Sequence, residues 1–372
     1  MIGNMRFNRI LMFSLGGINL LMLVAMGSTA GNTIIVDDDG AAGQYELIQD
    51  AIDNATTGDT IRVFEGEYVG GLTVNRSVSI IGNGSSTTKL IGQGLESNVI
   101  FITSDSVNLR GFSIIGPGKN PSPISEILSN AGIRISSSWN AISDIRITNS
   151  YFGIQMTASH STTISNLTID ECSKGIDLML STNSIITGTE ITNSLETAIY
   201  LSLSSYNSIL NNSIFGSGIS GIHFANANFN RIEENHLQDN QDGINLTQTQ
   251  DNRILGNTII LHEHGILVNG STRTTLDGNQ YVNNRYGLYL YHSHENDLNH
   301  SSFSNNSRDI VINDSTTNDL SHLPPSTNVL IIESEKSSDD QFEIPDWIPM
   351  VMYGILVTVA ASVFFQRRKK AV

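Results

Sequence analysis

Cysteine is almost absent from this sequence, and its absence excludes one common way of stabilising a fold. The single cysteine, Cys172, cannot form an internal disulfide, so stability must come from the stacking of repeated units. Cys172 also occupies a turn position at which other repeats have asparagine or histidine. We therefore interpret it as a small turn residue rather than a reactive thiol.

Positive charge is scarce between the two ends of the chain. Once the six basic residues of the ends are set aside, residues 31–346 have 14 basic and all 36 acidic side chains, a formal net charge of −22. Phosphate backbones bind basic surfaces, so we expect no nucleic-acid partner. We interpret the acidic surface as suited to solubility or a salty medium, and not as a cation-binding site.

Acidic residues are missing from both ends, where the long apolar runs lie. Residues 1–30 have only two charged side chains, Arg6 and Arg9, before an apolar run and a small-residue triplet that ends at Ala30. This order predicts a signal peptide, with an uncleaved anchor as the alternative. Either segment places the rest of the chain outside the cytoplasm.

Near the other end, residues 347–366 predict a transmembrane helix. The 18 residues from Ile348 to Phe365 have no charge, and at 1.5 Å each they span roughly 27 Å of hydrocarbon. An acidic linker, 333–346, precedes this segment, and a basic tail, 367–372, follows it. The positive-inside rule places the tail in the cytoplasm. A cleaved sorting signal that leaves a lipid anchor is the alternative for the same residues.

The region between the ends repeats about every 22 residues. Gly221, Gly243, Gly265 and Gly287 are 22 residues apart, and each opens a unit in which apolar residues alternate with polar ones. Such alternation over short runs predicts strands, and no unit has room for a helix. A fixed period of this length indicates a solenoid. We predict an all-β parallel β-helix over residues 61–332.

Asparagine recurs at two fixed positions of the repeat. The first column is Asn207, Asn230, Asn252, Asn296 and Asn318, and the second is Asn212, Asn235, Asn257 and Asn279. Asparagine tolerates the left-handed backbone of tight turns, and stacked asparagines can bond one another as a ladder. We predict turn ladders, with glycosylation acceptors or ligand groups as the alternative.

Two segments depart from the repeat. Within residues 31–60, a strand precedes a segment that has Tyr45, Ile48 and Ile52 at helical spacing, which predicts a helix that caps the first coil. Between Ile115 and Ala131, a proline-bearing stretch is too long for a turn. We interpret it as a loop that either walls a binding surface or is a tolerated insertion.

The early coils resemble a known family. The motifs are Val36-Asp-Asp-Asp-Gly40, Gly58-Asp-Thr-Ile-Arg-Val63, Gly66-Glu-Tyr68 and Val74-Asn-Arg-Ser-Val-Ser-Ile80, followed by Gly-Ile-x-Leu and Asn-x-Ile repeats. This order resembles NosD-type proteins of the pectin-lyase-like superfamily over about residues 34–323. The resemblance implies a single-stranded right-handed parallel β-helix. It implies no single function, because such repeats occur in sugar-cleaving enzymes, sugar-binding surface proteins and a copper-handling accessory protein.

No catalytic residue emerges from the motifs of lyases or glycosidases. Asp177, Asp242, Asp277 and Asp297 lie at different phases of the repeat, so they do not stack into a calcium site or a pair of catalytic carboxylates. Since the resemblance raises copper, two histidine pairs are weak candidate metal ligands: His262 with His264, and His292 with His294. Residues two apart share a face of a strand, so each pair permits a two-ligand site, whereas solvated turn histidines are the alternative.

The most informative column is the outward position between the paired aliphatics. It and the next outward column supply the predicted ligand-binding residues, which are Arg134, Gln155, Asp177, Tyr200, His223, Asn245, Tyr289 and Tyr291. Their rows are spaced at ~4.8 Å, which is close to the length of a sugar unit, and aromatic rings with polar partners suit sugars. An ordinary solvated β-face is the alternative.

Together these features predict a membrane-anchored, single-pass, extracytoplasmic protein, and they favour a non-catalytic role over an enzymatic one. We expect it to bind glycans or to organise neighbouring surface components, with the membrane, polysaccharides or other surface proteins as partners. We expect no cofactor, with copper or calcium as the weak exceptions. The alternatives are a polysaccharide lyase or hydrolase and a NosD-like copper-handling accessory protein.

Overall fold

The computed structural model describes residues 31–40, 43–94, 97–119 and 130–333. It also gives the backbone of two short antiparallel strands, β1 (Phe13–Leu15) and β2 (Ile18–Leu20). The predicted linker beyond Glu333, transmembrane helix and basic tail lie outside the described residues, as does the predicted signal peptide apart from β1 and β2. Within the described ranges, no helix is long and apolar enough to cross a membrane.

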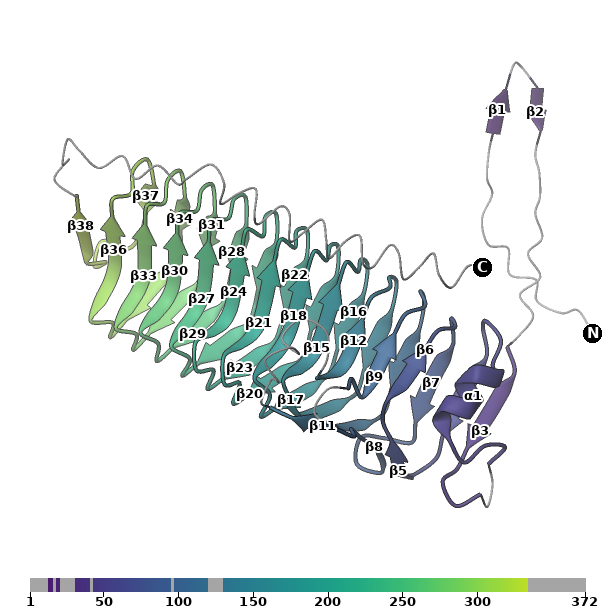
Figure 1. The fold of residues 1–372 in the computed structure, drawn as a ribbon. Helices are drawn as coiled ribbons and strands as arrows, with labels where there is room; N and C mark the ends of the chain where they lie inside the picture. Colours follow the sequence, from purple (N-terminus) through teal and green to yellow (C-terminus); the bar gives the residue numbers. More distant parts are fainter. Residues whose placement is uncertain are drawn as a thin grey trace, which may run out of the picture. The chain divides into compact units, whose positions relative to one another are not determined.

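The described chain winds as a right-handed parallel β-helix of about 12 turns (Figure 1). The strands form three long parallel sheets, which we call I, II and III and whose members are given below. Along the regular coils, successive strands join sheets I, II and III in turn, so each coil adds one strand to each sheet. This confirms the fold predicted from the 22-residue period.

Sheet I has 13 strands: β3 (Thr33–Val36), β4 (Thr60–Val63), β7 (Ser79–Gly82), β10 (Asn108–Arg110), β13 (Ala141–Ser143), β16 (Thr163–Ser165), β19 (Ile185–Thr187), β22 (Ser208–Leu210), β25 (Arg231–Glu233), β28 (Arg253–Leu255), β31 (Thr275–Asp277), β34 (Asp297–Asn299) and β37 (Asp319–His322). Sheet II has 11: β5 (Gly66–Val69), β8 (Thr88–Ile91), β11 (Ser113–Gly118), β14 (Arg146–Ser150), β17 (Thr168–Asp170), β20 (Glu190–Thr192), β23 (Ser213–Phe215), β26 (His236–Gln238), β29 (Thr258–Ile260), β32 (Gln280–Val282) and β35 (Ser302–Ser304). Sheet III has 12: β6 (Leu72–Val74), β9 (Ile100–Ile102), β12 (Ala131–Ile135), β15 (Phe152–Thr157), β18 (Lys174–Met179), β21 (Thr197–Ser202), β24 (Ser220–Ala225), β27 (Asp242–Thr247), β30 (His264–Asn269), β33 (Tyr286–Tyr291), β36 (Arg308–Asn313) and β38 (Val329–Ile332).

The core consists of stacked aliphatic side chains that point inward from all three sheets. In one coil, Ile244, Ile254 and Ile259 are fully buried, and each stands in register with an apolar residue of the next coil. Burying an aliphatic side chain of this size contributes roughly 1.5–3 kcal/mol. The period-2 alternation therefore records which residues face this core.

The recurrent glycines exist because neighbouring coils approach closely at the start of each sheet III strand. A Cβ atom at Gly243 would collide with the carbonyl oxygen of Gly265, and one at Gly265 would collide with that of Gly287. These glycines do not have positive φ angles. Steric clearance between coils, and not turn conformation, thus explains the 22-residue glycine period.

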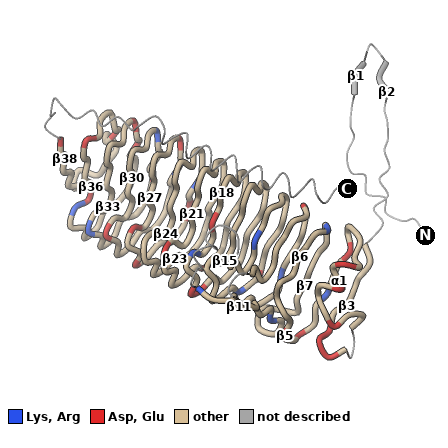
Figure 2. Tube along the Cα trace, viewed as in Figure 1, with Lys and Arg blue, Asp and Glu red and all other residues tan. Residues whose placement is uncertain are grey.

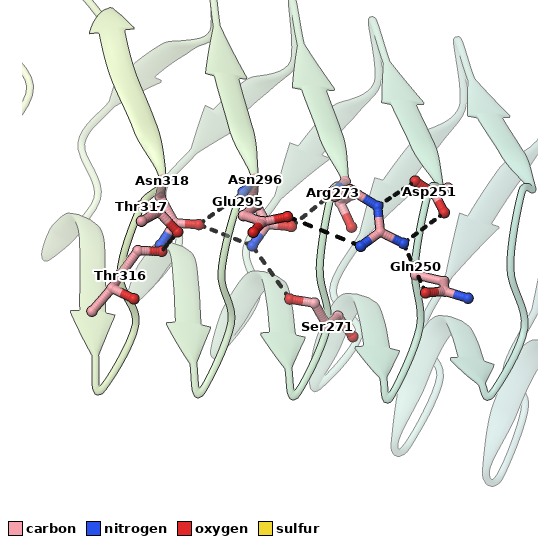
Figure 3. A network of polar contacts seen from close by, with 10 residues as sticks. Gln250, Asp251, Ser271, Arg273, Glu295, Asn296, Thr316, Thr317 and Asn318 are labelled. Carbon is pink, nitrogen blue, oxygen red and sulfur yellow. Dashed lines mark hydrogen bonds and ion pairs between the residues drawn. The ribbon is translucent and has the colours of Figure 1, made fainter.

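The predicted asparagine ladders are confirmed. The Asn235 amide N–H donates to Asn257 Oδ1 at 2.9 Å, and the Asn257 N–H donates to Asn279 Oδ1 at 3.0 Å. Figure 3 shows the other ladder, in which Asn296 donates to Asn318 Oδ1 at 3.0 Å. Ladder side chains such as Asn257 are buried, so they satisfy corner backbone groups inside the protein.

Cys172 lies in a third column of this kind, at the corner between sheets II and III. It is fully buried, and burial raises the pKa of its thiol to about 12. A thiol with so high a pKa is not a nucleophile near neutral pH. The structure therefore supports the interpretation of Cys172 as a structural turn residue.

The two ends of the solenoid differ. At the N-terminal end, α1 (Ile48–Asn54) buries Ile48, Ala51 and Ile52 against the first coil, as predicted for a cap. Tyr45 packs against the same core but precedes the helix instead of lying on it. At the other end, β38 extends sheet III, yet its four side chains are 40–59% exposed. β38 therefore does not bury an apolar cover over the last coil.

Candidate functional site: the outward face of sheet III

Seven of the eight predicted ligand-binding residues stand in one outward row across sheet III, which we call the central row. The register pairs each residue with the next along this row: Arg134, Gln155, Asp177, Tyr200, His223, Asn245, Leu267, Tyr289 and Val311. Tyr291 stands two residues away, in the next outward row beside Asn269. The arrangement predicted from the sequence is confirmed, whereas ligand binding stays a prediction.

A second row, which sequence reasoning missed, borders the central row at the corner between sheets II and III. Its register pairs Phe152 with Lys174, and it joins Thr197, Ser220, Asp242, His264, Tyr286 and Arg308 in order. Lys174 and Thr197 each lie two residues before the paired Ile176 and Ile199. Except for Arg308, which precedes Asp309, these corner-row residues directly precede the glycine or alanine of each repeat. A chemistry-bearing residue at that position was the available signal, since Lys174, Asp242, His264 and Tyr286 all occupy it.

Lys174 organises the N-terminal part of this face. Its ammonium lies 3.9 Å from Asp177 Oδ2 and 3.7 Å from Glu196 Oε2. The same ammonium lies 5.1 Å from the centre of the Tyr200 ring, a cation–π contact. The Tyr151 hydroxyl donates to Glu196 Oε1 at 3.1 Å. One lysine thus links two carboxylates and an aromatic ring.

Two groups in this part of the face are buried although they point away from the core. Asp177 is 4% exposed, and burial raises the pKa of its carboxyl to about 6, against the opposing effect of Lys174. Gln155 is 3% exposed, and its Oε1 has no hydrogen-bond partner among the described residues. A buried acceptor without a partner costs free energy, and such groups recur where a ligand supplies the missing donor.

Beside these residues lies the described start of the predicted loop excursion. Lys119 pairs with Glu171 at 2.9 Å, and its carbonyl oxygen accepts a hydrogen bond from the Ser173 hydroxyl at 2.7 Å. The described start of this segment, up to Lys119, therefore leaves sheet II and lies against the coil that carries Asp177. Residues 120–129 lie outside the described residues.

His223 joins the two halves of the face. Its ring centre is 5.1 Å from that of Tyr200, and its Nε2 lies 3.3 Å from Thr247 Oγ1. Burial lowers the pKa of His223, although Asp242 acts in the opposite direction. His223 is therefore a neutral hydrogen-bonding group at neutral pH.

The C-terminal part of the face is centred on a histidine–carboxylate pair. His264 Nδ1 lies 2.8 Å from Asp242 Oδ1, and the Asn245 amide donates to Asp242 Oδ2 at 3.0 Å. The His264 ring stacks on Tyr286 at 5.3 Å and meets Tyr289 edge-on at 5.4 Å. Aromatic platforms thus stand next to fixed polar groups.

The candidate metal ligands are not brought together. His262 was expected to share a strand face with His264, but it lies in the corner before β30, buried, with Nε2 3.2 Å from the Leu237 carbonyl oxygen. His294 pairs with Thr316 and His292 with Tyr291. Across the described ranges, no three histidine, cysteine, aspartate or glutamate side chains are placed to hold one metal ion. The described residues therefore offer no set of three such ligands for a copper ion.

As predicted, the four aspartates Asp177, Asp242, Asp277 and Asp297 do not stack into one site, although Glu196 lies near one of them. Asp177 lies in the central row and Asp242 in the corner row, three coils or about 14 Å away at the strand spacing. That separation exceeds the ~5–9.5 Å of glycosidase carboxylate pairs. The sequence reasoning missed that Glu196 approaches Asp177 through Lys174, because Glu196 precedes its strand.

Comparison with solved structures identifies proteins of similar fold. DFA-IIIase from Arthrobacter chlorophenolicus superposes with a TM-score of 0.63 at 13% identity, covering 82% of this chain and 99% of that one. The A-module of a mannuronan C-5 epimerase from Azotobacter vinelandii gives 0.58 at 12% identity, covering 77% and 93%. Identities this low show the fold alone.

Two sequence comparisons point to the cell exterior. A cell surface glycoprotein of Methanothermus fervidus is 34% identical over 103 residues, which is 27% of this chain and only 17% of that protein. The model of the family described as "Periplasmic copper-binding protein (NosD)" matches residues 52–260 and 214–322, well over half of the 372 residues. The chain belongs to the NosD family.

Proposed function

We propose that this protein is a surface-anchored, extracytoplasmic β-helix that binds an extended glycan along the outward face of sheet III. The observation that carries the proposal is the row of polar and aromatic residues that runs from Gln155 to Tyr289 across the central row, interrupted only by Leu267. The family's periplasmic description and the surface glycoprotein relative support the location. Anchoring rests on the apolar segment 347–366.

The chemistry of the face suits sugars. Tyr200 and Tyr289 are partly exposed in the central row, so the apolar side of a pyranose can stack on their rings. Asn245 and His223 supply donors and acceptors between the rings. Because successive rows lie about 4.8 Å apart, one sugar unit meets each coil.

The charges favour a neutral glycan over an acidic one. Lys174 is already shared between two carboxylates, so it has little charge left for a uronate. Basic residues are interspersed with acidic ones along the described coils (Figure 2). A polyanion would also meet the repulsion of a strongly acidic protein. We expect neutral polysaccharides to bind more tightly than acidic ones of equal length.

A glycan array probed with the detergent-solubilised full-length protein tests the proposal, and a titration with the best-binding glycan then tests the site. Tyr289→Ala should weaken binding roughly 3- to 10-fold, the range for loss of one aromatic contact. Phe215→Ala is the matched control, because that ring lies on sheet II, beside His236. Equal losses in the two variants, or binding to no glycan, would contradict the proposal.

A second candidate function is polysaccharide cleavage, and Asp177 favours it. Burial raises the pKa of this carboxyl to about 6, so near neutral pH it can hold or release a proton, as a general acid or base must. Lys174 links Asp177 to Glu196, and Tyr200 stands beside Asp177 in the central row. Release of reducing or unsaturated sugar ends that is lost in Asp177→Asn, with binding retained, would identify an enzyme.

A further inference from the structure

Asn-x-Ser/Thr triplets, the acceptor motif for N-linked glycans, fall into two structural classes in this chain. In the accessible class, the asparagine is exposed at a turn. Its members are Asn83, Asn166, Asn211 and Asn305. In the locked class, the amide or the hydroxyl two residues later is already hydrogen-bonded. Its members are Asn54, Asn75, Asn245, Asn269, Asn299 and Asn313.

Asn166 and Asn211 have the clearest acceptor geometry. Both are exposed at the corner between sheets I and II, with φ angles of 55° and 54°. Neither amide side chain is hydrogen-bonded to another described residue, and the same holds for the hydroxyls of Thr168 and Ser213 that complete their motifs. An exposed asparagine amide with a hydroxyl two residues later that has no partner is what a glycosyltransferase must reach.

In contrast, hydrogen bonds already engage the amide or the hydroxyl of the acceptor motifs on sheet III. The Asn245 amide donates to Asp242 at 3.0 Å, while the Thr247 hydroxyl of its motif donates to Asn245 Oδ1 at 3.0 Å. The motif of Asn269 ends in Ser271, which is fully buried and donates to the Asn269 carbonyl oxygen at 3.0 Å. These side chains cannot leave their partners without breaking the hydrogen bonds of the face.

The buried ladder asparagines belong to neither class, for a reason built into the fold. Asn235 and Asn257 are each followed two residues later by an inward aliphatic, Leu237 and Ile259. The core requires an apolar residue at that position, so a ladder asparagine cannot be part of the motif. Acceptor motifs are thereby confined to positions outside the ladders.

We propose that the exported protein is N-glycosylated at Asn166 and Asn211, and by the same criterion at Asn83 and Asn305. The donor is a lipid-linked oligosaccharide (di)phosphate. The amide nitrogen attacks the anomeric carbon, a C–N bond forms, the C–O bond to the lipid phosphate breaks, and the amide loses one proton as the lipid phosphate leaves. Three of these sites, Asn83, Asn166 and Asn211, lie at the corner between sheets I and II, across the core from sheet III. Glycans there leave the candidate ligand face open.

Glycopeptide mass spectrometry of the full-length protein, purified from the cells that naturally make it, tests the proposal without any substitution. Asn166 and Asn211 should carry glycan, and Asn245, Asn269 and Asn313 should be unmodified. Unmodified Asn166 and Asn211 would overturn the proposal, and so would equal occupancy of the two classes.

Matched variants then separate modification from folding. Asn166→Asp keeps a residue that tolerates the left-handed conformation, and Thr168→Ala keeps the asparagine itself. Each should lower the intact mass by one glycan, whereas Asn245→Asp should change it only by the substitution. Thr168→Ala that retains the glycan on Asn166 would show that the motif is not what the transferase recognises, which also overturns the proposal.

Discussion

The corner ladders and the outward face of sheet III use the same residue types at the same spacing, with opposite consequences. Asn257 and His262 are buried and bonded to the neighbouring coils, whereas Asn245 and His264 lie on the outer surface of the sheet. His262 and His264 are only two residues apart. The comparison teaches that register relative to the core, and not residue type, separates structural polar groups from candidate ligand groups in a solenoid.

Truncating one asparagine of each kind tests most directly whether ladder asparagines stabilise the fold more than outward ones. Asn257→Ala removes donors to the Ile232 and Asn279 oxygens and the acceptor of the Asn235 N–H. Each buried group left without a partner costs about 1–3 kcal/mol, so we expect about 3 kcal/mol of lost stability. Asn245→Ala should cost less, about 1 kcal/mol, because its hydrogen bonds to Asp242 and Thr247 are part-buried and water can replace them on the outer surface.

Urea unfolding midpoints of the two variants, compared with the wild type, measure this difference. Asn245→Ala serves as the control, because it truncates the same side chain in the same region. Similar losses in both variants would show that ladder asparagines have no special structural role.

Asp177 provides a pH-dependent test on the outward face. Burial raises the pKa of its carboxyl from 3.8 to about 6, so the folded protein binds this proton more tightly than the unfolded chain does. The carboxyl is then neutral in both states below pH 4, and above pH 6 the fold must keep it ionised and buried. Folding stability falls as pH rises between these limits, by up to about 3 kcal/mol from this group.

The substitution Asp177→Asn removes that penalty, because an amide of similar shape does not ionise. We expect a higher urea midpoint than wild type at pH 8 and equal midpoints at pH 4. An equal difference at both pH values would mean that burial does not perturb this carboxyl.

The buried His262 and the outward His264 allow the same test of stability within one coil. His262 links the Asn240 N–H and the Leu237 carbonyl oxygen through its two ring nitrogens, so His262→Ala should cost about 2 kcal/mol. His262→Asn should cost less, because asparagine occupies this position in adjacent coils, at Asn240 and Asn284. His264→Ala is the outward control, and thermal midpoints rank the three variants. A ranking in which His264→Ala is the most damaging would contradict the assignment of faces.

Much of the fold followed from alternation, because a fixed period records which side chains face the core. Strands such as β27 and β28 and both asparagine ladders were predicted in this way. β5 (Gly66–Val69) was missed, since Tyr68 is the sole residue of that strand to be buried. A four-residue strand with a single buried residue gives no alternation of apolar and polar residues that could be detected.

The site was only half predictable for a physical reason. The central row obeys strict alternation, so its members could be found from the sequence. Lys174 and His264 lie at the corner, where the glycine that follows interrupts alternation and the direction of a side chain depends on local backbone geometry. Burial of Asp177 and Gln155 likewise depends on neighbouring coils and cannot be inferred from their own repeat.

The smallest expected effect concerns the exposed ion pairs outside the ladder at the corner between sheets III and I (Figure 3). Arg273 pairs with Asp251 at 2.8 Å and donates to Gln250 Oε1 at 2.8 Å, and its side chain is 46% exposed. Water and salt screen such pairs, so they contribute little to stability. Alanine at position 273 also inherits the same left-handed φ of 52°, so backbone strain is similar in both proteins.

We expect Arg273→Ala to leave the urea midpoint within error at 1 M salt and to lower it only slightly at low salt. Asn296→Ala, on the inward side of the same corner, should lower the midpoint clearly at both salt concentrations. A salt-independent loss in Arg273→Ala as large as that in Asn296→Ala would show that the outer network, and not the ladder, holds this corner together.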